Sequence, residues 1–168
     1  VAGSGVLVVA ARDGEMPSSR CDGANAISDV RGAGGVIERT QMHLAHAVST
    51  VDVLLVSPGY PQATWFAFDG RLGSSVIVPS ELADRLGTHH GDSLTYRWTH
   101  SAQSSSDWST VDVDVVPPGR NRIDGVNDAI MFVQAASQRV QSCYVSADPL
   151  NVDGVRNAVR AYFGSGFV

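Results

Sequence analysis

The feature of this sequence that most limits its fold is a series of short apolar runs rich in β-branched residues. The longest uninterrupted run, residues 5 to 11, has about seven residues, whereas a helix that crosses a bilayer needs roughly 20. The chain holds 17 glycines and 7 prolines, and many of them lie between the runs. Short β-branched runs between such breaks are typical of strands. The pattern therefore predicts a sheet-based fold, without a transmembrane segment in the chain itself.

Two segments have the periodicity of helices. After turn residues 13 to 17, Ser18 or Ser19 is placed to cap a helix. Its apolar positions recur at helical spacing: Cys21, Ala24, Ile27 and Val30. The glycines at 32 to 35 are expected to end this helix. Near the C-terminus, Asp148 and Pro149 suit a helix start. An apolar stripe follows: Val152, Val155, Val159 and Tyr162 or Phe163. We expect both helices to pack on the sheet.

The remaining runs predict strands. We expect them at residues 5–12, 36–40, 42–48, 51–56, 130–133 and 140–147. The first is apolar nearly throughout, which indicates burial on both faces and a central place in the sheet. Residues 42–48 also fit a helix, and 130–133 fit a turn of helix. Residues 57–61 contain two prolines, which lack the N–H that a ladder needs, so a loop is expected there.

Residues 75 to 98 form the most regular stretch. Its parts are, in order, a strand at 76–78, Pro79, a short helix that begins at Ser80 and Glu81, Gly87 as a left-handed stop, a Gly91-Asp92 turn, and an alternating strand with Leu94, Tyr96 and Trp98. Serine-rich residues 101–109 are expected to form a hairpin loop before a strand at 110–116. The overall prediction is an α+β fold, a single domain over 1–168. It has a mixed or antiparallel sheet, two flanking helices, and an inserted β-rich lobe at about 60–118 that contains one short helix.

Composition excludes several classes of protein. A 43% hydrophobic content with 17% charged residues is not that of a disordered chain. The net charge is −5, and the 12 basic residues are all arginines scattered along the sequence. Nucleic acid binding and basic membrane-surface patches need clustered Lys and Arg, so neither is expected.

Cys21 and Cys143 are the only cysteines and lie near opposite ends of the chain. A disulfide between them would stabilise the fold by about 4–5 kcal/mol in the chain-entropy model and would need an oxidising compartment. Two separate buried thiols are the alternative. Neither cysteine has neighbours at metal-ligand spacing.

Few residues suggest catalysis or metal binding. His43 and His46 would share one side of a helix and bind a metal, together with His89 and His90, but in a strand they would point to opposite faces. Asp112 and Asp114 alternate with valines, which favours the solvated face of a strand over an acid–base pair or a calcium site. No Gly-x-Ser-x-Gly nucleophile elbow and no phosphate-binding loop is present. We expect no cofactor, no metal and no catalytic residue.

Four aromatic residues follow the Pro-Gly break within nine positions: Tyr60, Trp65, Phe66 and Phe68. An exposed cluster of this kind would be a recognition surface. The alternative is that the rings anchor a long connection to the core.

Two stretches, residues 76–87 with Gly91-Asp92 and residues 54–60, resemble the extracytoplasmic domain of MacB- and FtsX-like ABC-transporter permeases. The order of strand, leucine-rich short helix, Gly-Asp turn and strand carries the resemblance, and Cys143-Tyr144-Val145 with the final helix fits the end of such a domain. The same order also resembles AbrB-like and double-psi barrel modules. A disulfide between Cys21 and Cys143 and the long serine-rich loop would depart from the family pattern.

The resemblance implies a non-catalytic domain, cut from a larger protein and held outside the cytoplasm between transmembrane helices. It would couple ATP-driven movement to a substrate or partner outside the cell, with the transmembrane helices and ATPase of the parent transporter as partners. Such a location favours the Cys21–Cys143 disulfide. The start at Val1 fits a trimmed chain or a cleaved signal. The alternatives are a secreted or lipid-anchored binding protein and a small hydrolase that uses Ser and His.

Overall fold

The computed structural model describes residues 6–11, 14–45, 50–64, 76–89, 91–99, 108–116, 129–133 and 139–164. The strands are β1 (Val6–Ala10), β2 (Met16–Pro17), β3 (Val30–Leu44), β4 (Thr50–Val56), β5 (Val76–Pro79), β6 (Ser93–Trp98), β7 (Ser109–Asp112), β8 (Asp114–Val116), β9 (Ile130–Val133), β10 (Arg139–Val140) and β11 (Ser142–Ala147). The helices are α1 (Ser18–Gly23), α2 (Tyr60–Thr64), α3 (Ser80–Leu86) and α4 (Val152–Phe163), with short 3₁₀ turns at Ala24–Ala26 and Pro149–Asn151. The sheet is mixed, so the predicted α+β class is confirmed.

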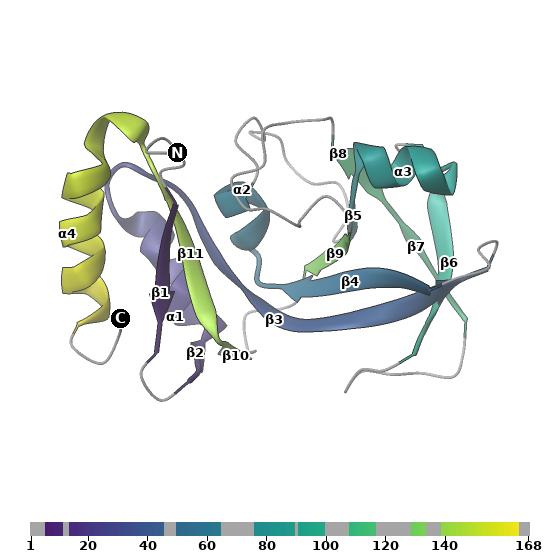
Figure 1. The fold of residues 1–168 in the computed structure, drawn as a ribbon, viewed down its shortest axis with the longest axis horizontal. Coiled ribbons are helices and arrows are strands. Elements are labelled where there is room, and N and C mark those ends of the chain that lie inside the picture. Colours follow the sequence, from purple (N-terminus) through teal and green to yellow (C-terminus); the bar gives the residue numbers. More distant parts are fainter. Residues whose placement is uncertain are drawn as a thin grey trace.

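The long strand β3 runs through two halves of the molecule (Figure 1). Its first part, up to Gly35, pairs with β11 in what we call the helical half, which also contains β1, α1 and α4. Its second part pairs with β4 and β6 in what we call the barrel half, which also contains β5, β7, β8, β9 and α3. The register shifts between Val36 and Glu38, where the strand passes from one half to the other.

Two expectations about β3 were wrong. Residues 36–40 and 42–48 are not separate strands, because a single 15-residue strand runs from Val30 to Leu44. The first helix is also shorter than predicted: it ends at Gly23, a 3₁₀ turn follows, and Val30 begins β3. The glycines at 32–35 therefore lie inside a strand, where they allow other backbone segments to approach closely.

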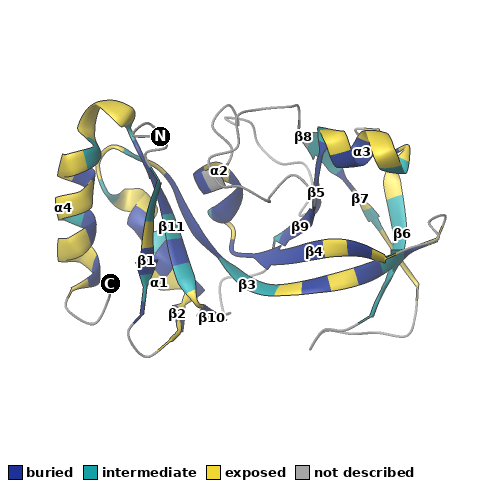
Figure 2. Ribbon diagram, in the orientation of Figure 1, coloured by how far each residue is buried: buried dark blue, intermediate teal, exposed yellow. Residues whose placement is uncertain are grey.

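The helical half is built on the antiparallel order β1-β11-β3. The side chains Val155, Val159 and Phe163 bury one face of α4 against the sheet, as the predicted stripe required (Figure 2). The full buried set is Val9, Ala11, Met16, Cys21, Ala24, Ala33, Val140, Cys143, Val145, Ala147, Val155, Val159 and Phe163. The prediction of a central first strand was wrong, because β1 ends the sheet and Val8 is 55% exposed.

The barrel half is a sheet that curls back on itself. Its strand order is β7-β6-β3-β4-β9-β5-β8, and the two outermost strands are consecutive pieces of one segment, joined through Val113. The backbone N–H of Val113 donates to the carbonyl of Asp92 at 3.1 Å. The enclosed core is Met42, Leu44, Val51, Val53, Leu55, Val76, Val78, Leu82, Ala83, Val113, Ile130 and Phe132.

Strands β5 and β9 and the last four residues of β4 are buried on both faces, and β5 is dark blue throughout in Figure 2. Alternate side chains contribute to the enclosed core and to an outer cluster. The outer cluster is Leu54, Val56, Tyr60, Ile77, Ala129 and Met131. The barrel half thus contains the second part of β3, β4 and β9, which lie outside the predicted lobe at about 60–118, as well as β5, α3, β6, β7 and β8, which lie within it.

The regular stretch from 76 to 98 folds as predicted, with strand, short helix, turn and strand in order. Gly87 ends α3 in the left-handed conformation, with φ of 67°. The predicted serine cap of the first helix was wrong: α1 has Pro17 at its N-cap and no side-chain cap. Helix α3 begins at Ser80 as predicted, with Pro79 at its N-cap and no side-chain cap. Strands β6 and β7 pair in antiparallel fashion, as expected for the two arms of a hairpin, and residues 101–107 of the predicted loop lie outside the described residues.

None of the described helices is both long and apolar enough to cross a membrane.

Candidate functional site

The two halves meet at a polar junction made by α1, β3 and the turn between β4 and α2. The hydroxyl of Ser57, at the end of β4, donates to Oδ1 of Asp22 at 2.7 Å and accepts from the backbone N–H of Gly35 at 2.8 Å. The side-chain amide of Asn25 pairs with both backbone groups of Ala33, at 2.9 Å each. Ser57 is fully buried, so this junction replaces water for several polar groups.

Glycines allow these segments to approach one another. A Cβ at Gly34 would overlap the backbone N of Tyr60, and a Cβ at Gly59 would overlap the carbonyl of Ala33. A side chain at either position would push α2 away from β3. This is the physical reason why the glycine run lies in a strand rather than at the end of a helix.

Burial perturbs two ionisable groups beside the junction. It raises the pKa of the Asp22 carboxyl above its ordinary value of 3.8, against the smaller effect of hydrogen bonds from Ser57 and from the backbone of Gly59. Burial also raises the pKa of the Tyr60 phenol, Tyr144 raises it further, and Arg39 opposes the shift. Ser57 uses its hydroxyl both as donor and as acceptor, so it serves here as a structural bridge.

The predicted aromatic surface is described only at Tyr60, which is 1% exposed. Its ring packs edge-on against Tyr144, with centroids 5.6 Å apart. Tyr60 therefore anchors α2 to the sheet and does not face solvent. Trp65, Phe66 and Phe68 lie outside the described residues.

Two shallow cavities flank the part of β3 between the halves, and Arg39 lines both. One, of about 320 Å³, also has Gln41 and Asp52 in its wall. The other, of about 370 Å³, also has Glu38, Gln141 and Tyr144. Both cavities are polar and charged at the rim, which suits contacts with another protein or a polar solute better than a closed apolar ligand site.

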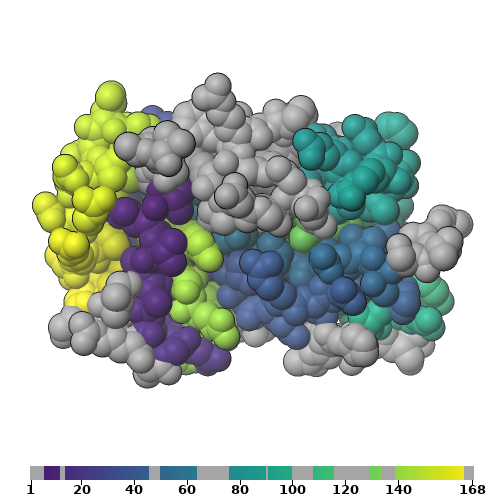
Figure 3. Space-filling view, in the orientation of Figure 1, coloured from purple at the N-terminus to yellow at the C-terminus, as the bar shows by residue number. Residues whose placement is uncertain are grey.

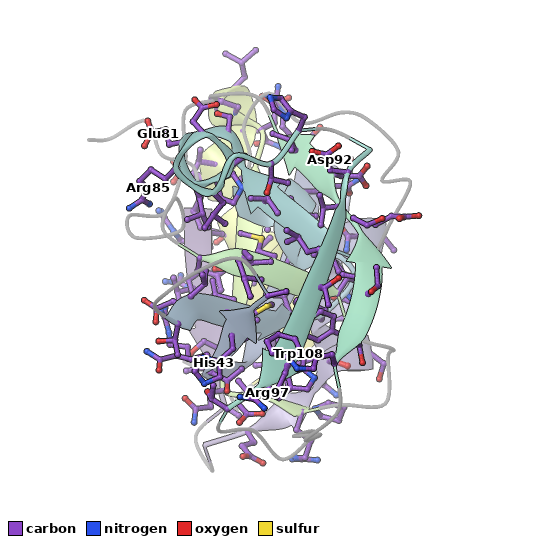
Figure 4. All side chains as sticks on the ribbon, turned by 90° about the vertical axis from the view of Figure 1, so that its right-hand side faces the viewer. His43, Glu81, Arg85, Asp92, Arg97 and Trp108 are labelled. Carbon is purple, nitrogen blue, oxygen red and sulfur yellow. A yellow bond between two sulfur atoms is a disulfide. The ribbon has the colours of Figure 1, made fainter. Side chains whose placement is uncertain are left out.

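The far end of the barrel half carries an exposed aromatic residue. Trp108 is 48% exposed, and the guanidinium of Arg97 lies 5.0 Å from its ring centroid. His43 is opposite Arg97 in the β3–β6 ladder. Figure 4 shows these three side chains together, at the opposite end of this face from Glu81, Arg85 and Asp92. We call this set, Arg97, Trp108 and His43, the distal patch.

A third cavity, of about 470 Å³, lies between the end of α3 and the strands β3 and β6. Leu44, Leu86 and Leu94 give it an apolar part, and Arg85 and Asp92 lie at its rim. Asp92 also accepts a hydrogen bond from the backbone of His89 at 2.8 Å, so its carboxylate holds the turn after α3.

Of the four histidines considered for metal binding, the structure describes His43 and His89. His43 lies in a strand, the conformation in which a metal site shared by His43 and His46 is not expected. His46 and His90 are outside the described residues. Asp112 accepts from the Ser93 hydroxyl at 2.7 Å on the outer face of β7, as expected for a solvated strand face. Within the described part of the chain, no group of three or more His, Cys, Asp or Glu is placed to hold a metal.

Cys21 and Cys143 are joined in a disulfide, with Cα atoms 5.4 Å apart. The bond links α1 to β11 inside the core of the helical half, where both cysteines are fully buried. The alternative of two separate buried thiols does not hold in this structure.

Comparisons with known proteins place the fold. The structure is similar to the extracellular domain of the noncanonic ABC-type transporter YknZ from Gram-positive bacteria, with a TM-score of 0.54 and 9% identity over 96% of this chain and 97% of that one. It is also similar to a domain of a protein assigned as a permease from Porphyromonas gingivalis, with a TM-score of 0.50 and 15% identity over 98% of this chain and 87% of that one. The chain shares their fold. No family model and no curated protein matches the sequence.

The polar junction and the distal patch were not predicted from the sequence. Asp22 and Ser57 are 35 positions apart, so only the fold brings them together. The one available signal was the glycine run at 32–35, since several glycines in a strand indicate close backbone approach.

Proposed function

We propose that this chain is a non-catalytic extracytoplasmic domain of an ABC-transporter permease of the MacB and FtsX type. The observation that carries the proposal is the fold shared with two permease domains, which covers nearly the whole of this chain and most of each neighbour. The domain would couple transporter movement, driven by an ATPase inside the cell, to a substrate or partner outside.

The positions of the two chain ends support this proposal. The first described strand, β1, and the last described helix, α4, both belong to the helical half (Figure 1). A domain held between two transmembrane helices must send both of its ends toward the membrane. The helical half would then lie next to the membrane, and the barrel half would project away from it.

The junction supports a coupling role. Strand β3 is continuous between the halves, and the Ser57 hydroxyl at the end of β4 is hydrogen-bonded to Asp22 and to the backbone of Gly35 in the helical half. A movement of the membrane-proximal half would therefore reach the barrel half through paired backbone and not through a flexible loop. The distal patch is a surface for a partner, because exposed Trp and Arg are enriched where proteins bind one another. Trp65, Phe66 and Phe68 remain a predicted recognition surface.

The disulfide supports the location. Structural disulfides persist in oxidising compartments and are rare in the cytosol. A buried bond between Cys21 and Cys143 suits a domain outside the cytoplasm.

The test labels the full-length native protein in intact cells. Thr110→Cys places a thiol on the exposed strand β7, and both cysteines of this domain are in the disulfide, so labelling of the variant is compared with labelling of the unsubstituted protein. We expect a membrane-impermeant maleimide to label this variant in whole cells, and the labelled protein to sediment with membranes and purify with an ATPase. Labelling only after lysis would overturn the extracytoplasmic location. Labelled protein released in soluble form would favour the secreted binding protein instead.

A further inference from the structure

Among the strands that the structure describes, β1 is the last one at its edge of the sheet. It pairs with β11 from Val6 to Ala10, and within the described residues no other strand pairs with it. Figure 3 shows β1, in purple, at the surface of the helical half. The outer backbone N–H and C=O groups of an edge strand are a template for another extended segment.

This edge lacks the features that normally prevent pairing. Residues 6 to 10 read Val-Leu-Val-Val-Ala, with no charge, no proline and no bulge in the pairing with β11. By contrast, the edge strand β7 reads Ser-Thr-Val-Asp and carries the exposed carboxylate of Asp112. Proteins usually protect such edges with charge or proline, so an unprotected apolar edge is a pairing site.

The side chains of β1 divide between two faces. Leu7 and Val9 contribute to the core beneath α4. Val8 is on the other face, opposite Tyr144 of β11, and is 55% exposed. Val8 thus has an apolar neighbour on one side and an open edge on the other. Residues 6–10 thus have the composition of a central strand, although β1 lies at the edge of the described sheet.

We propose that β1 pairs in antiparallel fashion with β1 of a second copy of this chain, about a two-fold axis at Val8. Val6 of one copy would lie opposite Ala10 of the other, Leu7 opposite Val9, and Val8 opposite Val8. In this register, core-facing residues of one copy lie opposite core-facing residues of the other, as Leu7 does opposite Val9. The core faces of both sheets therefore lie on the same side. The register allows backbone hydrogen bonds whether the outward N–H and C=O groups belong to Val8 or to Leu7 and Val9.

A second copy fits this edge because two-fold pairing places identical residues near the axis opposite each other. A charged residue at Val8 would oppose its own copy, and β1 has none. The two sheets would join as one antiparallel sheet, with a row of Tyr144, Val8, Val8 and Tyr144 across the axis on the face away from α4. Symmetric two-fold dimers are the commonest oligomers.

The interface is small. Five residues span about 17 Å, so the pairing is at the low end of specific interfaces and the dimer should depend on protein concentration. The proposal does not depend on the permease assignment, since it uses only the composition and the open edge of β1.

The first experiment measures association of the 168-residue chain by sedimentation over a range of protein concentrations. We expect a monomer–dimer equilibrium that Val8→Lys weakens by about tenfold or more, because two ammonium groups would meet at the axis. Thr110→Lys, the same change on the exposed edge of β7, is the matched control and should leave the equilibrium unchanged. A wild-type monomer at every concentration, or a dimer that Val8→Lys does not weaken, would overturn the proposal.

The second experiment is chemical and does not need a change of charge. Val8→Cys supplies one free thiol per chain, because both natural cysteines are in the disulfide. Directly opposite residues of antiparallel strands have Cα atoms about 4.5–5.5 Å apart, within the range of a disulfide. We expect Val8→Cys to form a covalent dimer under mild oxidation much faster than Thr110→Cys. Equal rates for the two variants would contradict pairing at β1.

Discussion

The carboxyl group of Asp22 shows at the scale of one residue how burial and hydrogen bonding oppose each other. Because burial dominates, its pKa in the folded protein is above the ordinary value of 3.8. A raised pKa means that the folded state holds the proton more tightly than the unfolded state. The contribution of Asp22 to stability is therefore full below about pH 4 and is lost as the pH rises through the folded pKa.

Asp22→Asn tests this sign. The amide keeps an acceptor for the Ser57 hydroxyl but does not titrate, so its cost is constant with pH. We expect the free energy of unfolding of the wild type to fall relative to that of the variant as the pH rises from about 4 toward neutrality. Denaturant unfolding at several pH values measures the difference. A wild type that gains stability relative to Asp22→Asn over this range would show that the hydrogen bonds dominate instead.

A second prediction at this scale concerns Gly34. Its missing Cβ gives room for the backbone of Tyr60, which cannot move without shifting α2. Gly34→Ala should lower the free energy of unfolding on the order of 3 kcal/mol, the cost of overpacking a core. Gly87→Ala is the control: nothing lies within 4 Å of its Cβ position, and its φ of 67° should cost only about 1–2 kcal/mol. Similar losses for both variants would mean that the contact with Tyr60 relaxes easily.

At the scale of elements, one side chain caps the 3₁₀ turn Pro149–Asn151 that leads into the last helix. The Asp148 carboxylate accepts from the backbone N–H of Leu150 at 3.0 Å, and its Oδ1 lies 3.5 Å from the Arg31 guanidinium. Asp148→Ala should cost about 1 kcal/mol, mostly through the lost cap. The control is Asp153→Ala, which removes an exposed pair with Arg156 and should cost about 0.5 kcal/mol or less. Thermal unfolding measures both, and equal losses would argue against the cap.

Local signals predicted those elements whose residues are decided by their neighbours in sequence. The stretch from 76 to 98 and the last helix were predicted correctly, because an apolar stripe and a Gly87 stop act over a few residues. The predicted start at Asp148 is the start of the 3₁₀ turn that leads into this helix. The first strand was misplaced because the sequence cannot show whether an apolar run has one neighbour or two. The glycines at 32–35 were misread because their cause, the approach of Tyr60 and Gly59, is more than 20 positions away. The polar junction was missed for the same reason.

At the scale of the whole molecule, the disulfide closes a loop of 122 positions that contains the entire barrel half. Replacing both cysteines, Cys21→Ala with Cys143→Ala, should lower the free energy of unfolding by about 2–5 kcal/mol. Denaturant unfolding with and without reductant provides the control, since reductant should destabilise the wild type and leave the variant unchanged. If reductant does not change the denaturant unfolding of the wild type, the disulfide does not form in solution.

Strand β3 also limits how the molecule can deform. Many two-part proteins open and close about a loop, and each part keeps its own sheet intact. Here one uninterrupted strand supplies hydrogen bonds to β11 at one end and to β4 and β6 at the other. Any rotation of one half against the other must therefore be absorbed as torsion along that strand, centred on the register shift between Val36 and Glu38. A torque applied to the helical half would therefore twist β3 elastically before the two halves could separate.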